Sequence, residues 1–483
     1  MKNKSKIVLL CGNFNVIHSG HLRILRFAKK LGGKLFVGVN SDKLASKAAF
    51  IPEKKRLEGV KSNTFVDKSF IIKKSLQKEI LKIRPNIIVK GQEYENKFNI
   101  EEKILKKWGG KIIFSSGDAN LSSIDLINKE FKSYTNVVIK HDKHFLQRHK
   151  ISKENLIENL KNFKKKNVLV VGDSIVDEYI TTQPVGMSQE DPTIVVTTLD
   201  NKKFIGGASI IASHASSLGA KSKIITIAGQ DKGEKFLKKE LKIKGVNAKI
   251  IVDDSRPTTI KKRYRTSGKN LFRVNIQDQR PISKIIQNKI FNEFKKTIKK
   301  VDLLILSDFN YGCLPKLLVD KILDFVKKIK KNRKIFVVAD SQSSSQVGDI
   351  LKFKNADLLS PTEHEARLAM RDFYSGLVEL AVDLLKKTKS KNLILTLNKD
   401  GVLIQTLNRN KFSTDKITSL ALDVKDVAGA GDAMLISSAL SMVSGGSIWI
   451  SSYLGSIASA LEIKKVGNVP LKIKELVEEV NKI

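Results

Sequence analysis

The chain has 483 residues, 41% of them hydrophobic, and a formal net charge of +39 from 88 Lys and Arg against 49 Asp and Glu. This length predicts two or three domains, and the hydrophobic fraction excludes a disordered chain. Two cysteines, Cys11 and Cys313, are too few and too far apart to staple a secreted fold. The first apolar run is too short for a signal peptide, and none approaches the roughly 18 apolar residues of a membrane span. We therefore expect a cytoplasmic protein with no membrane partner.

The basic excess raises the question of a nucleic-acid partner. Lysines supply most of it and are spread along the whole chain, whereas a nucleic-acid binder concentrates its positive charge on one face. Aromatic residues, on which bases stack, make up 6% of the chain. The composition favours small phosphorylated substrates drawn in by long-range steering, and a nucleic-acid binder remains an alternative.

Strand and helix patterns alternate through the first part of the chain. Apolar runs at 6–12, 34–42, 85–91 and 111–116 have the character of buried strands, and amphipathic helical stretches lie between them. Such alternation is typical of a parallel α/β sheet. We predict a Rossmann-like domain over residues 1–132.

A polar, Lys-rich stretch follows at 133–165 and contains His141, His144 and His149. A metal site is the alternative that three histidines raise. Their spacing is irregular and no cysteine lies near them, so we interpret the stretch as a solvated linker that leads into a short helix.

The rest of the chain, residues 166–483, predicts one large α/β domain. Its apolar runs each end in a polar or turn residue, and they lie at 167–174, 302–308, 334–340, 356–361 and 392–397. Ligands of open α/β sheets bind beyond the carboxyl ends of the strands, where these polar residues fall.

The first chemical motif is the sequence CGNFNVIHSGH at 11–21, directly after the first strand. His18 and His21 are three residues apart at a predicted helix start, so both rings can face one side. A helix N-terminus attracts an anion, and two imidazoles beside it would clamp a phosphate. The alternative is a pair of exposed histidines at a helix cap.

The segment GNFNVIHSGH resembles the G-x-F-D-x-x-H-x-G-H signature of cytidylyltransferase-like nucleotidyltransferases. The likeness continues through VNSD at 39–42, KKRLEGV at 54–60, VKGQEY at 89–94 and LSSIDLI at 121–127. VKGQEY in particular is similar to the VKGGDY of the bifunctional ADP-heptose synthases. This resemblance implies a nucleotide and phosphate site made by Gly12, Phe14, His18, His21, Lys47, Arg56, Lys90, Ser122 and Ser123.

Such a domain needs no protein nucleophile, because a sugar phosphate is already an anion that can attack the α-phosphorus of a nucleotide. The protein aligns the reactants and neutralises the triphosphate. The sequence departs from the family pattern at Asn15, where an Asp is usual, and in a short loop after Asp42 in which Lys43 or Lys47 would contact phosphate. Both departures affect the prediction of which substrate is bound more than the prediction of nucleotidyl transfer.

The second motif is GAGD at 429–432, directly before an apolar helical run. Small residues at a helix start expose backbone N–H groups as an anion hole, and Asp432 would take the proton from a neutral sugar hydroxyl. A tight turn with a capping Asp is the alternative.

Two glycine segments, IGGASIIASHASSLGA at 205–220 and VAGAGD at 427–432, resemble the two signatures of ribokinase-type (PfkB) sugar kinases. The intervening motifs follow in the family order, and GDSIVDEY at 172–179 is similar to the GDxxxDxY of heptose 7-phosphate kinases. The resemblance implies Asp432 as base, Gly429, Ala430 and Gly431 as anion hole, and Glu365 as a Mg²⁺ organiser acting through water. It implies a sugar-phosphate site of Asp173, Asp177, Gly206, Gly207, Lys261 and Arg263, and an adenine site bordered by Gly401, Ser456 and Gly467.

The kinase part departs from its family at five positions. Ile210 stands where a sugar-binding Asn is expected, Thr362 where an Asn is expected, and Asn275 where an Asp is expected. Tyr311 and Gln342 replace two lysines of the family. The domain order is also the reverse of that usual in ADP-heptose synthases. These differences make phosphoryl transfer a firmer prediction than any particular sugar.

Together the motifs predict a bifunctional enzyme that uses ATP and Mg²⁺. One half would phosphorylate D-glycero-D-manno-heptose 7-phosphate at C1, and the other would join the product to AMP and release pyrophosphate. The alternatives are another sugar or polyol phosphate, CTP in place of ATP, or a kinase half that only binds sugar phosphate. The family resemblance also implies a possible homodimer.

Overall fold

The computed structural model describes residues 6–17, 19–31, 33–91, 98–115, 139–191, 193–266, 269–343, 348–409, 411–421, 424 and 426–483. The chain divides into two compact units, Met1–Asn136 and Val137–Ile483. Within the described ranges, no helix has the length and apolar character needed to cross a membrane.

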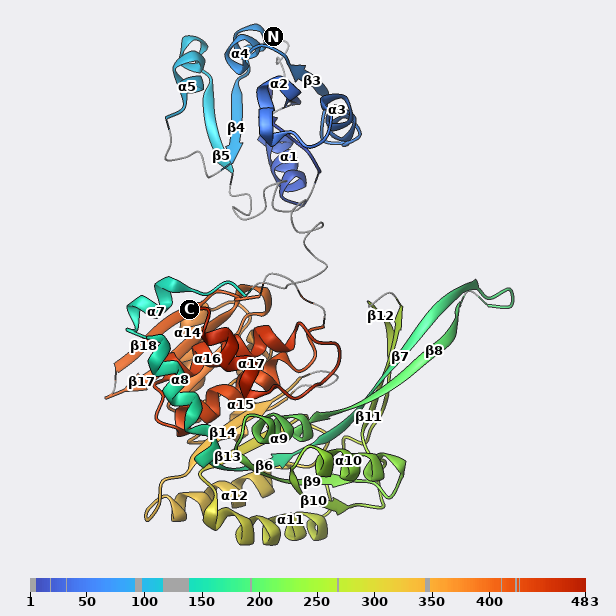
Figure 1. Ribbon diagram of the computed structural model, residues 1–483, viewed down its shortest axis with the longest axis vertical. Coiled ribbons are helices and arrows are strands. Elements are labelled where there is room, and N and C mark those ends of the chain that lie inside the picture. The colour runs from blue at the N-terminus through green and yellow to red at the C-terminus, as the bar shows by residue number, and fades with distance from the viewer. Residues whose placement is uncertain are drawn as a thin grey trace. The chain divides into compact units, whose positions relative to one another are not determined.

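The first unit is built on a parallel sheet with the strand order β3-β2-β1-β4-β5 (Figure 1). Its strands are β1 (Ile7–Gly12), β2 (Lys34–Asn40), β3 (Lys68–Ile72), β4 (Ile87–Gly91) and β5 (Lys111–Ser115). Its helices are α1 (Ser19–Leu31), α2 (Asp42–Ala45), α3 (Glu53–Lys61), α4 (Leu76–Ile83) and α5 (Ile100–Leu105).

Both faces of this sheet are covered, because successive side chains of a strand point to opposite faces. Val8 and Leu10 of β1 pack with α1 and α3, whereas Leu9 packs with α4 and α5. The predicted Rossmann-like class is confirmed, and the carboxyl end of β1 opens towards the start of α1.

The second unit contains a large sheet and a small one. The large sheet has the order β10-β9-β6-β13-β14-β15-β16-β17-β18 and is parallel except where β17 meets its two neighbours. Its strands are β6 (Asn167–Gly172), β9 (Lys221–Ala228), β10 (Asn247–Val252), β13 (Leu303–Asp308), β14 (Phe336–Ser341), β15 (Leu358–Leu359), β16 (Asn392–Thr396), β17 (Val402–Asn408) and β18 (Lys411–Ile417).

Helices cover both faces of the large sheet, in agreement with the predicted α/β class. One core contains residues of α7 (Lys143–Arg148), α8 (Lys153–Lys161), α9 (Ala208–Ser217), α10 (Lys232–Ile243), α15 (Ala430–Val443), α16 (Ile448–Glu462) and α17 (Ile473–Val480). The other contains residues of α11 (Lys284–Thr297), α12 (Lys316–Ile329), α13 (Glu363–Met370) and α14 (Leu377–Thr388).

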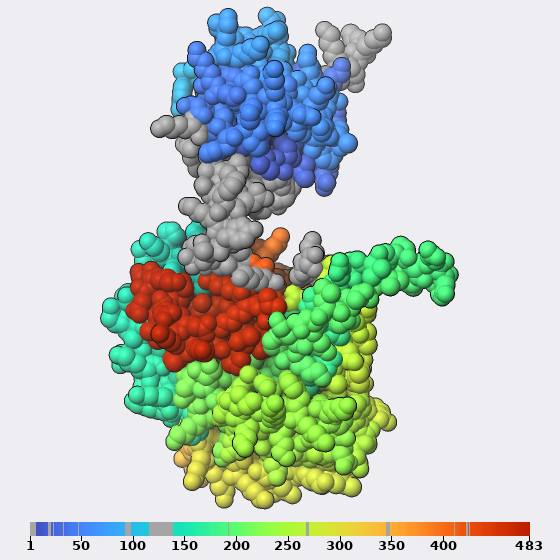
Figure 2. Space-filling view, turned by 45° about the vertical axis from the view of Figure 1, so that its right-hand side comes forward, coloured from blue at the N-terminus to red at the C-terminus, as the bar shows by residue number. Residues whose placement is uncertain are grey.

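The small sheet has the order β12-β11-β7-β8 and was not among the predicted elements. Its strands are β7 (Ser174–Met187), β8 (Ile194–Gly207), β11 (Ile260–Thr266) and β12 (Lys269–Ile276). Figure 2 shows the paired β7 and β8 extending away from the body of the second unit. The inner end of β7 is buried from Ser174 to Ile180, so this sheet has its base in the core.

The linker predicted at 133–165 is wrong over its described part, 139–165. Phe145, Leu156 and Leu160 are buried in the main core of the second unit, and α8 contacts α17 at the other end of that unit. These apolar residues recur at helical spacing between lysines, so the overall polarity of the stretch concealed an amphipathic pattern. We call residues 139–165 the docking segment.

Two of the three histidines of the docking segment, His141 and His149, are held by other side chains of the second unit. His141 Nδ1 lies 3.1 Å from the Tyr453 hydroxyl, and His149 Nε2 lies 2.7 Å from Asp415 while its ring stacks on Trp449. Within the described residues, no group of three or more His, Cys, Asp or Glu side chains is arranged to hold a metal ion.

Candidate active sites

A cavity of about 880 Å³ lies in the second unit, between the carboxyl ends of the large sheet and the small sheet. Eleven of the predicted kinase residues line it: Asp177, Gly207, Lys261, Arg263, Glu365, Gly401, Gly429, Ala430, Gly431, Asp432 and Ser456. Because they come from distant parts of the chain, their convergence depends on the tertiary fold.

The start of α15 forms one wall of this cavity. Gly429 is the N-cap residue and adopts φ +79°, a left-handed conformation that favours glycine. A Cβ at Gly431 would meet no atom within 4 Å, so the backbone there is open to a ligand. This geometry suits the predicted anion hole, because the first N–H groups of a helix have no partner within it.

Asp432 lies in the first turn of α15 and is buried. Burial raises the pKa of its carboxyl to about 7, and the positive charge of Lys261 opposes that rise. A carboxyl with this pKa is suited to accept a proton near neutral pH, as a general base must.

Lys261 of β11 brings a buried cation towards Asp432. Its Nζ lies 5.3 Å from the ring centre of Phe309 and 5.2 Å from that of Tyr311, which places the ammonium over two aromatic faces. On the other side, Gln342 Nε2 donates to Asp432 Oδ1 at 3.3 Å. Two of the five residues that differ from the family pattern thus lie next to these groups. Gln342 lies beside the predicted base Asp432, and Tyr311 lies beside Lys261.

Asp177 forms the centre of the predicted sugar site. Arg263 NH2 donates to its Oδ1 at 3.1 Å, and Asn468 Nδ2 donates to its Oδ2 at 2.9 Å. A Cβ at Gly206 would overlap Oδ2 of Asp177, so a larger residue there would displace that carboxylate. Gly207 has φ +62° and lines the cavity next to it. Asn468 was missed by the sequence analysis, since a lone Asn after a glycine carries no signal.

Asp173 lies outside the cavity, which does not support its predicted contact with the sugar. Its Oδ2 accepts hydrogen bonds from the backbone N–H groups of Phe309 and Tyr311, and its Oδ1 accepts one from Cys313. Burial and the nearby charge of Asp308 raise the pKa of the Asp173 carboxyl to about 6. Its oxygens are therefore used to anchor a loop.

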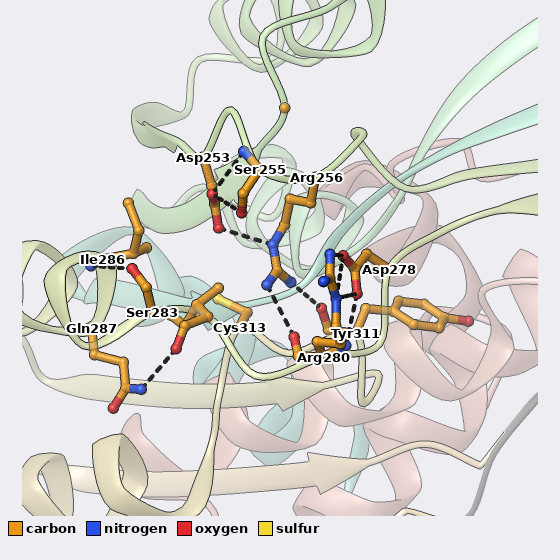
Figure 3. Close-up of polar contacts among 12 residues, drawn as sticks. Asp253, Ser255, Arg256, Asp278, Arg280, Ser283, Ile286, Gln287, Tyr311 and Cys313 are labelled. Atoms are coloured by element: carbon orange, nitrogen blue, oxygen red, sulfur yellow. Dashed lines mark hydrogen bonds and ion pairs between the residues drawn. The ribbon is translucent and has the colours of Figure 1, made fainter.

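The loop after β13 is also held from its other side. Figure 3 shows Arg256 donating to the backbone oxygens of Tyr311 and Arg280, at 3.2 and 3.0 Å, while its Nε pairs with Asp253 at 2.9 Å. Tyr311 and Phe309, which carry the rings under Lys261, are thus fixed by backbone contacts at both ends of the loop.

Glu365 is the predicted organiser of Mg²⁺, and its carboxylate is held by two backbone donors. Oε2 accepts from Thr362 N at 2.7 Å in a capping box, and Oε1 accepts from Ser343 N at 2.8 Å. Thr362 caps α13 through its hydroxyl, a task that Thr and Asn share.

The cavity wall beside Glu365 fits a divalent cation held through water. Asp340 has a buried Oδ1 without a hydrogen-bond partner among the described residues, and burial together with Glu365 and Asp432 raises its pKa well above the usual range. Three mutually repelling carboxyls gain from a nearby cation, and Mg²⁺ prefers oxygen ligands and keeps several waters.

Of the remaining predicted kinase residues, some border the cavity and others lie away from it. Gly401 adopts φ +90° and borders the cavity with Ser456, whereas Gly467 packs on the ring of Phe204 and does not line the cavity. Ile210 is buried in the core of the unit, which explains an apolar residue there. Asn275 lies on β12, away from the cavity lining.

Arg56 in the first unit is 1% exposed and is occupied by contacts within the protein. It donates to Asp42 at 2.5 Å and to the backbone oxygens of Ile51 and Asn13 at 2.6 and 2.8 Å. The Arg56 hydrogen bond lowers the pKa of Asp42. Arg56 therefore holds the turn that follows β2, and its predicted contact with phosphate stays a prediction.

Other predicted nucleotide ligands surround the end of β1. Phe14 adopts φ +51° and its ring lies 5.0 Å from that of His21, whose Nδ1 is 3.0 Å from the Val16 oxygen. A Cβ at Gly12 would lie 3.3 Å from the Phe14 ring. Lys90, at the end of β4, pairs with Glu101 at 3.0 Å and donates to Asn99 at 2.7 Å.

Asn15 has a structural explanation that the sequence did not supply. Its Nδ2 donates to the Ala48 oxygen at 2.8 Å, and its Oδ1 accepts from Phe50 N at 3.0 Å. A carboxylate cannot donate to Ala48, so this arrangement requires the amide.

Part of the predicted nucleotide site lies outside the residues that the structure describes. His18, Ser122 and Ser123 are not among the described residues, and Lys47 is described only as part of the 3-10 turn Ser46–Ala48. Their predicted contacts with nucleotide stay predictions.

Comparison with protein families matches residues 165–473 to the pfkB family carbohydrate kinases. The chain belongs to this family. Residues 9–128 match the cytidylyltransferase-like family, so a nucleotidyltransferase domain precedes the kinase domain. The chain is thus an enzyme with a carbohydrate kinase domain and a nucleotidyltransferase domain, and the two predicted families are confirmed.

Curated relatives match over the greater part of the chain. It is 30% identical over 323 residues to the Bifunctional protein HldE of Sulfurimonas denitrificans, covering 66% of this chain and 65% of that protein. It is 27% identical over 319 residues to the protein of the same name from Nitratiruptor sp., covering 65% of each. The chain therefore spans about 65% of the length of these relatives.

Solved structures share the fold of the second unit. Ribokinase of Arabidopsis thaliana, complexed with ribose and ATP, matches with a TM-score of 0.52 at 16% identity, over 65% of this chain and 98% of that chain. Phosphofructokinase-2 of Escherichia coli matches with a TM-score of 0.52 at 13% identity, over 66% of this chain and 99% of that chain. These matches confirm the predicted ribokinase-like fold.

Proposed function

We propose that the protein makes a sugar nucleotide in two steps. The second unit phosphorylates D-glycero-D-manno-heptose 7-phosphate at C1 with ATP, which gives ADP and the 1,7-bisphosphate. After a separate phosphatase has hydrolysed the 7-phosphate, the first unit transfers AMP from a second ATP to the heptose 1-phosphate. The products of the two activities and this hydrolysis are ADP, inorganic phosphate, pyrophosphate and ADP-heptose. The observation that carries the proposal is the single cavity in which Asp432, the glycine turn of α15 and the Asp177–Arg263 pair converge. The name of the relatives, a bifunctional protein, supports two activities in one chain.

The kinase step follows from the residues around Asp432. Its carboxylate takes the proton of the C1 hydroxyl, and the freed oxygen attacks the γ-phosphorus of ATP. Backbone N–H groups at the start of α15 stabilise the transferring phosphoryl group. Asp177 accepts hydrogen bonds from sugar hydroxyls, and the cations of Lys261 and Arg263 attract the 7-phosphate. Glu365 would hold Mg²⁺ through water, and the ion would supply neutralisation of charge on the ATP phosphates.

The nucleotidyl transfer needs no base. An oxygen of the 1-phosphate attacks the α-phosphorus of ATP, and the bond to pyrophosphate breaks. His18 and His21 at the start of α1, with Lys47, Lys90, Ser122 and Ser123, bind the triphosphate in this proposal. α1 is the first helix after β1, and its N-terminus favours an anion.

Another sugar or polyol phosphate is the second candidate substrate. The observation that favours it is the changed set of sugar contacts, in which Asp173 anchors a loop and Asn468 binds Asp177. Two further alternatives remain open to test: the first unit uses CTP in place of ATP, or the second unit binds sugar phosphate without transferring phosphate. We further propose a cytoplasmic enzyme whose partners are small molecules and a possible second copy.

The decisive experiment measures pyrophosphate release by the whole protein with heptose 7-phosphate, Mg²⁺, an added phosphatase that hydrolyses the 7-phosphate of the bisphosphate, and either ATP or CTP. We expect release with ATP, and its loss in both His18→Ala and Asp432→Asn. Supplied heptose 1-phosphate should restore release in Asp432→Asn but not in His18→Ala. Release with CTP alone, or with a different sugar phosphate alone, would replace the proposed substrates.

A further inference from the structure

Asn468 touches both halves of the kinase cavity. It lies after α16, is 6% exposed, and lines the cavity. Its Nδ2 donates to Asp177 at 2.9 Å, on the proposed sugar side. Its Oδ1 lies 2.9 Å from the position that a Cβ of Gly429 would take, against the turn that opens α15. One amide therefore binds the carboxylate of one subsite and lies against the glycine turn of the other.

The acceptor end of this amide is unpaired. Among the described residues, Asn468 Oδ1 is buried without a hydrogen-bond partner. An unpaired buried oxygen is costly, and such groups in native structures tend to mark a functional constraint. Because the oxygen faces the Gly429 turn, a small shift of that turn would change its surroundings directly.

A second buried group supports the same turn. Glu462, at the end of α16, is 1% exposed, and its Oε1 lies 3.3 Å from the same Cβ position at Gly429. Burial raises its pKa to about 8, against the opposing charge of Lys465, with Asp432 and Glu475 as the neighbouring acids. Glu462 is therefore mainly protonated at neutral pH, which reduces the negative charge next to the anion hole.

We propose that Asn468 is a positioning residue that couples sugar binding at Asp177 to the anion hole at Gly429. A sugar that engages Asp177 changes the hydrogen bond to Asn468 Nδ2, and the rigid amide passes the change to the Gly429 turn. The inference rests on the proposed function, because it assumes a sugar at Asp177 and a phosphoryl group at Gly429–Gly431. Coupling of this kind is reciprocal, so each ligand must tighten the binding of the other by the same factor.

Calorimetric titration of the full chain tests this inference. The Mg²⁺ complex of a non-hydrolysable ATP analogue is titrated with and without saturating heptose 7-phosphate. We expect the sugar phosphate to tighten nucleotide binding about tenfold in the wild-type protein, within the usual range of coupling between sites. In Asn468→Ala, each ligand alone should bind within about threefold of wild type, and the coupling should be lost.

Asn159→Ala is the matched control. Asn159 is a buried amide of the same unit that donates to the Ser441 oxygen at 3.1 Å and does not line the cavity. It should keep the tenfold coupling. If Asn468→Ala does not fold, the isosteric Asn468→Asp takes its place, and its charge against Asp177 should also abolish the coupling.

Three results would overturn the inference. They are coupling preserved in the Asn468 variants, coupling lost equally in Asn159→Ala, and no coupling in the wild-type protein. If heptose 7-phosphate does not bind the wild-type protein, the proposed substrate is wrong, and fructose 6-phosphate replaces it in the same titrations. Absence of coupling with that sugar as well would contradict the role of Asn468 itself.

Discussion

The side-chain amide of Gln342 donates to Asp432 Oδ1 across 3.3 Å, so the proposed base has a neutral neighbour on that side. The resemblance to sugar kinases led us to expect a lysine at this position. A neutral partner leaves the pKa of Asp432 high, at about 7, because burial is opposed chiefly by Lys261.

We therefore expect kinase kcat/KM to rise with pH through about 7, since the base must be ionised to accept a proton. Gln342→Lys places a cation beside the carboxyl and should move the midpoint down by about one pH unit or more. Initial rates of ADP formation from pH 5.5 to 9 measure both midpoints. An unchanged midpoint in Gln342→Lys would show that the observed step does not depend on Asp432.

Glu462 makes stability depend on pH in a defined direction. Its pKa is about 8 in the folded protein, above the ordinary value of 4.5, so the unfolded state loses its proton first as pH rises. The stabilising contribution is complete below about pH 4.5 and is lost between there and pH 8. Glu462→Gln has no proton to lose, and should gain on the order of a few kcal/mol relative to wild type between pH 5 and 9. Denaturant unfolding of both proteins at pH 5 and at pH 9 measures the difference in their free energies of unfolding. An equal difference at the two pH values would contradict a buried, neutral Glu462.

Phe145 makes the docking segment part of the kinase fold. It is fully buried, and Phe→Ala substitutions at such sites cost about 3–5 kcal/mol, so Phe145→Ala should destabilise the second unit by that amount. Leu317→Ala, at a side chain that is 63% exposed, is the control and should change stability little. Equal effects in urea unfolding would mean that the segment does not pack as described.

Asn15→Asp tests the amide in the first unit. The substitution removes the donor to the Ala48 oxygen and sets two acceptors against each other, which should cost about 1–3 kcal/mol. Thermal melting of the full chain should show a lower transition for the first unit, with the transition of the second unit unchanged. A rise in stability would indicate that the Asp of related sequences suits this chain as well.

The sequence predicted those parts of the site that local motifs specify. Gly429 to Asp432 are contiguous, and their turn and helix start follow from residue type alone. Asn468 was missed because its role arises from packing against Asp177 and Gly429, which lie far away in the chain. Asp173 was misjudged because the motif that contains it gives no sign of the backbone N–H groups that capture its carboxylate.

The fold, like the site, was predicted in part. Continuous apolar runs revealed most strands of the first unit and the central strands of the large sheet, which are β1, β2, β4, β5, β6, β13, β14, β15 and β16. The runs did not reveal β3, β9, β10, β17, β18 or the small sheet. The inner part of β7, Ser174 to Ile180, is buried throughout, so it lacks the alternation by which a half-exposed strand is recognised. The docking segment was predicted as a linker because lysines dominate its composition. Its packing, however, depends on buried apolar residues such as Phe145 and Leu156.

The contact of α8 with α17 brings the beginning and the end of the second unit together. Lys153 Nζ donates to the Asn481 oxygen at 3.0 Å, and Leu156 and Leu160 share a core with Leu476 and Val480. A domain fused before or after this unit would thus leave from neighbouring points on its surface. The position of a fused domain, before or after the kinase, therefore makes little demand on the kinase fold, and a circularly permuted kinase joined through α17 and α8 should retain its architecture.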